Sequence, residues 1–138
     1  MDARKILNHL SKEELIDLVV EYSRLGFFPL EPFLLQTNYV FSPDELQELW
    51  QSAYEKARQY EDQKSELGAD LLKDIAELCF EHAINLKEPD SRSEVLHMLI
   101  DDLIKANEED GIGMYYDSEW FYGEVREKIE AYLGISTR

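Results

Sequence analysis

Residues able to bind a metal ion occur at helical spacing in two places of the sequence. Glu94 and His97 have the Glu-x-x-His spacing that places both side chains on one helix face, as in carboxylate-bridged di-iron bundles. Such a site needs a second motif of this kind. The nearest candidate, Cys79 to His82, offers a thiol where hard iron prefers a carboxylate. Because acids make up more than a fifth of the chain, one such motif is expected by chance.

A zinc site is the other metal chemistry that these residues allow. Cys79, His82 and His97 could meet across neighbouring helices, and thiolate and imidazole are ligands that zinc prefers. Cys79 and His82 also fall on an apolar helical stripe with Ile75 and Leu86, which favours a buried thiol and a hydrogen-bonded core histidine. We therefore predict no metal site and no cofactor.

The remaining motifs do not support an enzyme. A calcium loop with Gly111 as its obligatory glycine fails on register, because Ala106 stands where the first carboxylate is needed. The Gly111-Ile112-Gly113 stretch follows three carboxylates and no strand, which is wrong for a phosphate loop. No serine or cysteine lies in a recognisable nucleophile turn.

A cluster of aromatic residues among acids is the strongest candidate for a binding site. Residues 111–123, GIGMYYDSEWFYG, hold five aromatics, and eight acids but a single base lie between Asp101 and Glu124. Trp and Tyr dominate the energetics of protein interfaces, and surrounding charge sets the rate and the choice of partner. We call the following residues the aromatic–acidic patch: Glu109, Asp110, Tyr115, Tyr116, Asp117, Glu119, Trp120 and Glu124.

Two interpretations of this patch stay open from sequence. On a regular final helix Phe121, Val125 and Ile129 face the core, which leaves Trp120 on the opposite, charged face. Trp120 is then either an exposed anchor for a partner or the centre of a satellite core. In the second case the loop folds back and Trp120 stacks on one of the two preceding tyrosines.

The net charge limits the classes of partner. Thirty acids against fourteen bases give −16, which argues against direct binding of nucleic acid or an anionic membrane and favours a basic protein. Cys79 is the only cysteine, so a reducing compartment is the simpler interpretation. The N-terminal ten residues lack a signal-peptide core, and the apolar stretch 27–35 is too short to span a bilayer. We expect a cytoplasmic protein.

Helix start and stop signals place these residues in a single compact all-α domain, residues 1–138, of about six helices. Ser11 and Glu14 form a capping box, and Ser42-Pro43-Asp44-Glu45 forms another that adds proline at the first helical position. We predict a third box at Ser91–Glu94. The expected helices cover about 2–9, 12–25, 43–66, 69–87, 92–107 and 118–133, with one further turn near Glu31-Pro32.

We expect Gly26, Gly68 and Gly134 to end helices, and Gly111 and Gly113 to form a tight connection. The helix 69–87 is apolar on more than one side and is expected to be central. The apolar stripe of the helix 43–66 comprises Leu46, Trp50, Ala53, Ala57 and Tyr60.

Four functions are compatible with this pattern. In general character the chain resembles the acidic helical immunity proteins of nuclease bacteriocins, although it is longer and its helices are spaced differently. The shared element is the Tyr115-Tyr116 pair among carboxylates, and the resemblance implies an inhibitor of a basic partner such as a nuclease or toxin. The alternatives are a DNA mimic, a helical adaptor or homo-oligomer, and a metal-dependent enzyme. The aromatic cluster counts against the mimic.

Overall fold

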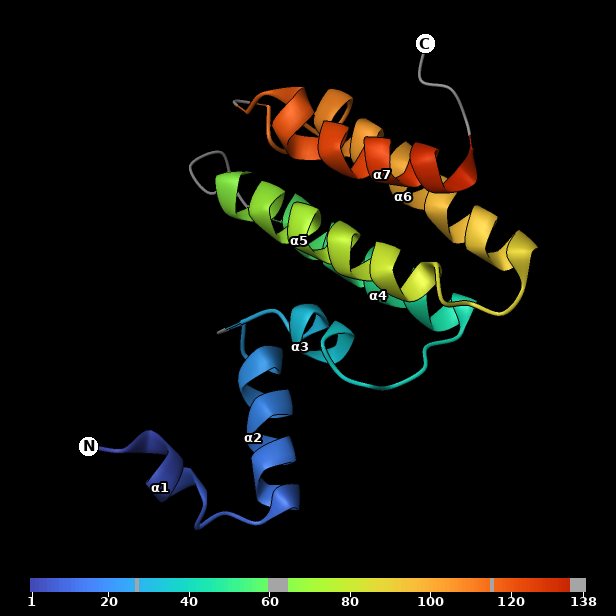
Figure 1. Cartoon of the computed structure of the whole chain (residues 1–138). Coiled ribbons are helices and arrows are strands. Elements are labelled where there is room, and N and C mark those ends of the chain that lie inside the picture. Colours follow the sequence, from blue (N-terminus) through green and yellow to red (C-terminus); the bar gives the residue numbers. More distant parts are fainter. Residues whose placement is uncertain (27, 60–64, 115, 135–138) are drawn as a thin grey trace.

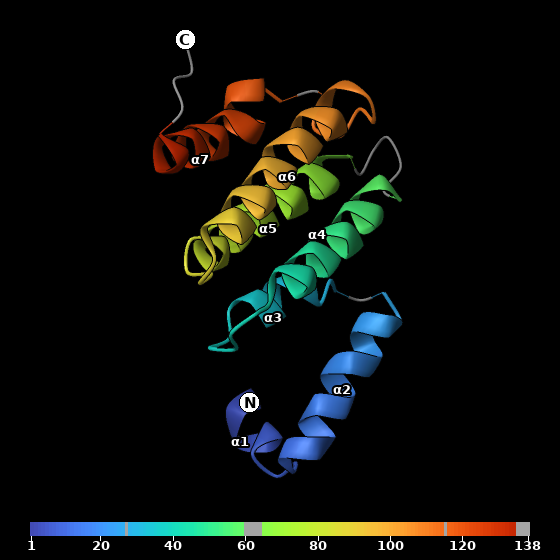
Figure 2. The same cartoon turned by 90° about the vertical axis from the view of Figure 1, so that its right-hand side faces the viewer.

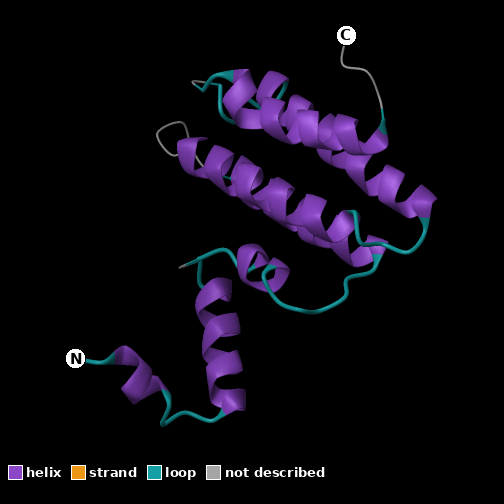
Figure 3. Cartoon of the chain, viewed as in Figure 1, coloured by secondary structure: helices purple, strands orange, loops and turns teal. Residues whose placement is uncertain are grey.

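The computed structural model describes residues 1–26, 28–59, 65–114 and 116–134 (Figure 1). Within these ranges all regular structure is helical, which confirms the predicted all-α class (Figure 3). The longest helices are α4 (Pro43–Arg58), α5 (Ser65–Ala83) and α6 (Pro89–Glu108). A π-helical turn, η2 (Glu119–Gly123), leads into α7 (Glu124–Leu133). None of the described helices combines the length and apolar content that crossing a membrane requires.

The core lies between α4, α5, α6 and α7. Helices α4 and α5 run side by side, α6 packs on both of them, and α7 covers α5 and α6 (Figures 1 and 2). The predicted stripe of α4 is buried from Leu46 through Trp50 and Ala53 to Ala57. Helix α5 contributes Leu72, Ile75 and Cys79, and is central as expected. Burial of these side chains against one another stabilises the bundle through the hydrophobic effect.

Helix α4 begins at the predicted signal. The Ser42 hydroxyl accepts a hydrogen bond from the Glu45 backbone, and the Glu45 carboxylate accepts one from the Ser42 backbone. The short helix α3 (Glu31–Leu35) also starts where predicted, and it packs against α4 and α5. Its Glu31 carboxylate is buried and accepts bonds from Ser52 and Lys56 of α4. These bonds fasten α3 to the bundle.

Two predicted helix boundaries are wrong. Helix α4 ends at Arg58, not near Glu66, and Gly68 lies inside α5 instead of ending a helix. A glycine in a helix interior costs only about 1 kcal/mol, which the burial of neighbouring α5 residues offsets. Tyr60, at the end of the predicted α4 stripe, lies outside the described residues.

Helix α6 starts earlier than predicted. It begins at Pro89 after Glu88, so Ser91 stands in the first turn and forms no capping box with Glu94. Proline is favoured at the first helical position, where its missing N–H has no partner to lose. Arg92 supports this start, because its guanidinium donates to the carbonyl of Leu86 at 2.6 Å.

The first two helices contribute no buried side chain to the core. Helices α1 (Ala3–Leu7) and α2 (Lys12–Arg24) bury no residue, and both stand away from the bundle (Figures 1 and 2). The Ser11–Glu14 capping box is present, and Gly26 has the positive φ of +88° predicted for the stop. The local signals of α2 are therefore confirmed, but its apolar residues Leu18, Val19 and Tyr22 are exposed.

Candidate functional site

The connection from α6 to α7 is built on glycines at positions where a side chain would not fit. Gly111 and Gly113 both have φ of +70°, as their predicted role in a tight connection requires. A Cβ on Gly113 would lie 3.2 Å from the Cβ of Ala69 and 3.2 Å from the ring of Phe121. The absence of a side chain at Gly113 therefore lets the connection approach both α5 and the last helical segment.

The π-turn changes which residues face the core. In η2 the Glu124 N–H bonds to the Glu119 carbonyl, one residue further back than in an α-helix. Gly123 makes room for this turn, since a Cβ there would lie 2.6 Å from the Glu119 carboxylate. Asp117 caps the turn by accepting from the Glu119 N–H at 2.9 Å, whereas Ser118 makes no side-chain capping bond.

This shift corrects the expected position of Trp120. A regular helix would place the indole on the charged face, but in the structure it is half-buried and packs against the core. Its ring lies 4.4 Å from the ring of Tyr116, with the two planes tilted by 46°. The stacking expected for a satellite core is therefore present at Tyr116. Tyr115 lies outside the described residues.

Lys73 of α5 holds the aromatic pair to the bundle. Its ammonium lies 4.3 Å from the centre of the Trp120 ring, within the range of a cation–π contact. The same ammonium donates to the Trp120 carbonyl at 2.7 Å and to the Glu124 carboxylate at 3.3 Å. Only 12% of the Lys73 side chain is exposed. We call Lys73, Tyr116 and Trp120 the indole platform.

Acids from three segments surround the indole platform. Asp117 and Glu119 come from the connection and η2, and both are exposed, as is Glu124 of α7. Helix α5 adds Glu66 and Asp70. Burial, together with these two α5 carboxylates, raises the pKa of Tyr116. The structure thus assembles a negatively charged rim around a half-buried aromatic pair.

Asp110 of the predicted patch faces a different neighbour from the other acids. Its carboxylate accepts a hydrogen bond from the Tyr54 hydroxyl of α4 and lies 3.9 Å from the Arg58 guanidinium. Burial and this carboxylate raise the pKa of Tyr54. Glu109 is exposed at the end of α6. Asp110 therefore stabilises the packing of α4 on the end of α6.

The sequence did not point to Lys73, Glu66 or Asp70 as parts of the site. Glu66 was assigned to the wrong helix because Gly68 was interpreted as a stop. The close approach of Gly113 to Ala69 brings the start of α5 to the aromatic pair. A contact of this kind, between residues far apart in the chain, leaves no periodic signal in the sequence.

Cys79, His82 and His97 are not brought together as a metal site. Cys79 is buried, and burial raises the pKa of its thiol to about 12. His82 shares a 2.6 Å hydrogen bond with the carbonyl of Leu35, and exposed His97 bonds to Ser93 on its own helix. Among the described residues, no three His, Cys, Asp or Glu side chains lie close enough together to hold a metal ion.

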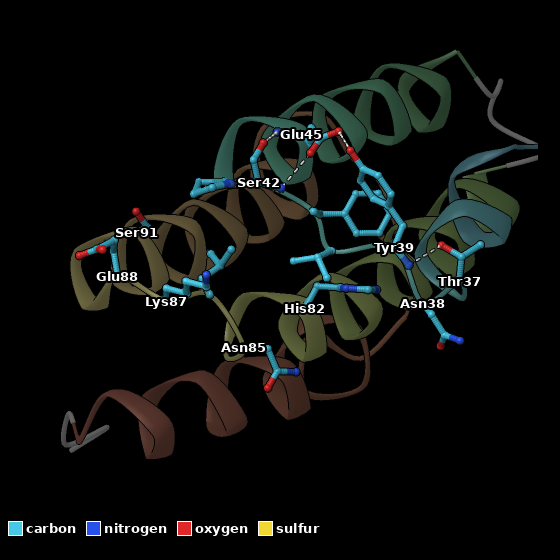
Figure 4. Close-up of a pocket in the computed structure, with 14 residues that line it drawn as sticks. Thr37, Asn38, Tyr39, Ser42, Glu45, His82, Asn85, Lys87, Glu88 and Ser91 are labelled. Carbon is cyan, nitrogen blue, oxygen red and sulfur yellow. Dashed lines mark hydrogen bonds between the residues drawn. The ribbon is translucent and has the colours of Figure 1, made fainter.

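A cleft of about 610 Å³ lies at the opposite end of the bundle, between the segment 37–43 and the loop from α5 to α6 (Figure 4). Tyr39 donates to Glu45 at 2.6 Å, and Thr37 donates to the carbonyl of Leu34. His82 meets the edge of Phe41, with ring centres 4.8 Å apart. The side chains of Thr37, Tyr39 and His82 therefore form hydrogen bonds within the chain, which account for their positions in the cleft wall.

Comparison of the chain with protein-family models, curated proteins and solved structures found no match.

Proposed function

We propose that this protein binds a basic protein partner through the indole platform and its acidic rim, without catalysing a reaction. The observation that carries this proposal is the convergence of acids on the aromatic pair: Glu66 and Asp70 lie near Tyr116, and Glu124 meets Lys73 beneath the Trp120 ring. Lys73 is the one cation described in the platform, and it is engaged inside it. The rim therefore keeps a strong negative potential toward solvent, which would steer a basic surface onto it.

The aromatic pair supports a role beyond charge. Its rings are held in place by Lys73 and by packing against the core, so a partner would not have to order them on binding. Arginine is the cation best suited to such a site, because its planar group stacks on aromatic rings and forms paired hydrogen bonds with carboxylates. A basic protein with an exposed arginine fits this surface, as expected for an inhibitor of the immunity type.

The test must separate loss of binding from loss of fold. Trp120 packs against the core, so truncating it would also disturb the bundle. We instead propose Glu66→Gln with Asp70→Asn, here called the patch variant, which removes two exposed charges from the rim beside Tyr116. The matched control is Glu48→Gln with Glu94→Gln, which removes two exposed charges from α4 and α6. Both double variants have the same net charge.

The measurement is affinity capture of basic proteins from the native cell lysate near physiological salt. We expect one predominant basic protein on the wild type and on the control variant, with at least tenfold less on the patch variant. This corresponds to about 0.7 kcal/mol for each rim charge. Affinity of the purified pair should fall as salt rises, but not vanish, because the stacked contact is not screened. Equal capture by all three proteins contradicts the proposal.

A further inference from the structure

Helix α2 has an apolar face that the described bundle does not cover. On this face Leu18 and Val19 are each 38% exposed, and Leu15 is partly exposed. The opposite face is charged and comprises Glu13, Glu14, Asp17, Glu21 and Arg24. An amphipathic helix of this kind ordinarily buries its apolar face, since exposed apolar area is unfavourable in water. Something outside this chain's own core is therefore needed to cover it.

The spacing on this face suits a second helix. Leu15, Leu18, Tyr22 and Leu25 follow one another at intervals of three, four and three residues, the repeat of helices that pack side by side. Leu25 is 53% exposed at the end of the helix. Val19 lies between Leu15 and Tyr22 on the helix surface and broadens the strip. The face thus has the pattern of a helix-to-helix contact.

The distribution of charge along the chain favours a second copy as the partner that covers the apolar face of α2. Residues 1–26, which we call the arm, hold four bases and five acids, so the arm is almost neutral. The other residues carry nearly all of the −16 charge. Two bodies of such charge repel each other, and only the arm can meet another copy without strong repulsion. The arm also stands away from the bundle, which keeps the two bodies apart (Figure 2).

Other occupants fit the arm less well. An anionic membrane attracts helices whose polar face is basic, whereas the polar face of α2 holds four acids and one base. A basic protein would be drawn to the acidic bundle before the arm. The near-neutral charge of the arm and the helical spacing of α2 favour a surface of the same kind, which another copy supplies.

We propose that two copies of this chain form a dimer in which α2 packs antiparallel on α2 of the second copy. Antiparallel pairing places the two bundles at opposite ends of the paired helices. A helix of 13 residues spans about 20 Å, which exceeds the distance over which charges interact at physiological salt. The proposal is independent of the proposed function, because the arm and the aromatic–acidic patch share no residue.

The test is the mass of the full chain by sedimentation equilibrium. The wild type should have twice the mass of the 16.2 kDa chain, and Val19→Glu should have the mass of one chain. The control, Arg24→Gln, changes the net charge by the same amount on the polar face and should stay a dimer. Leu18→Glu should repeat the effect of Val19→Glu, and circular dichroism should show unchanged helix content, since both positions are exposed.

The salt dependence of the mass distinguishes an apolar dimer from an electrostatic association. Raising salt from about 0.1 M to about 1 M should leave the dimer intact or strengthen it, because screening reduces repulsion between the bundles. A wild type that stays monomeric up to about 1 mM overturns the proposal. A dimer that survives both α2 variants, or that dissociates in salt, overturns it too. Weakened capture of a basic partner by the patch variant bears only on the proposed function.

Discussion

Removing the Lys56 side chain tests how α3 is fastened to the bundle. Glu31 is only 3% exposed. Its carboxylate oxygens accept hydrogen bonds from the Lys56 ammonium at 2.7 Å and 3.0 Å, and one of them accepts a bond from the Ser52 hydroxyl at 2.7 Å. Lys56→Ala leaves this buried carboxylate with the hydroxyl alone. Breaking a fully buried ion pair costs about 3–5 kcal/mol. Because 38% of the Lys56 side chain is exposed, we expect a loss of about 2 kcal/mol.

The pH dependence of this loss identifies its cause. Burial opposes ionisation of Glu31, but the bonds from Lys56 and Ser52 outweigh it and hold the pKa of Glu31 below its usual 4.5. The contribution of this group to stability is therefore present above pH 4.5 and declines as pH falls through the folded-state value. Without Lys56, burial raises the pKa, and protonation relieves the buried charge. The difference in unfolding free energy between wild type and variant should begin to narrow above pH 4.5, at the raised pKa of the variant, and should narrow further as pH falls through the lowered pKa of the wild type.

The assay is urea unfolding followed by circular dichroism at several pH values. Lys128→Ala is the matched control, since it removes one exposed lysine from α7 and should change the unfolding free energy by less than about 0.5 kcal/mol. Glu31→Gln combined with Lys56→Ala should be more stable than Lys56→Ala alone at neutral pH. A loss that is the same at every pH, or equal in Lys128→Ala, would refute the reasoning.

Three further predictions concern the core and its connection. Trp50→Phe removes the 2.8 Å bond from the indole to Asp102 and should cost about 1–2 kcal/mol in urea unfolding, whereas substituting Asp102 by Asn should cost less. Gly113→Ala should destabilise by at least about 1 kcal/mol in the same assay, because its φ is +70° and its neighbours leave little space. Because the Cys79 thiol is buried and its pKa is raised, it should react with a thiol reagent at neutral pH only as fast as the chain unfolds. A reaction rate that does not change with urea concentration would contradict this prediction.

The sequence predicted those features whose cause lies within a few residues. The capping boxes at Ser11 and Ser42 are hydrogen bonds between residues three apart, so their pattern is visible in the chain. The positive φ values of Gly26 and Gly134 follow from the same local logic. The apolar period of α4 also sufficed to assign its buried face, because that face meets neighbours on both sides.

The errors arose where a distant contact decides the outcome. The indole of Trp120 turns inward because η2 holds an extra residue in its turn and because Lys73 of α5 meets the ring. Neither the π-helical turn nor the contact with Lys73 can be predicted from the spacing of apolar residues along the sequence. The apolar period of α2 indicates a helix with an apolar stripe, but periodicity shows only that a face is apolar and not what covers it. For the same reason the site could be located in the sequence but not assembled from it.

Two α4 side chains form hydrogen bonds with residues far along the sequence, and this has a consequence for folding during synthesis. The Trp50 indole and the Tyr54 hydroxyl find their acceptors 52 and 56 residues further along, at Asp102 and Asp110. While the chain is being made, α4 and α5 can pair early, but these two polar groups stay in water until α6 has emerged. Tight closure of the core is thus a late event, and it is completed only when the acidic segment that carries the candidate site is itself in place.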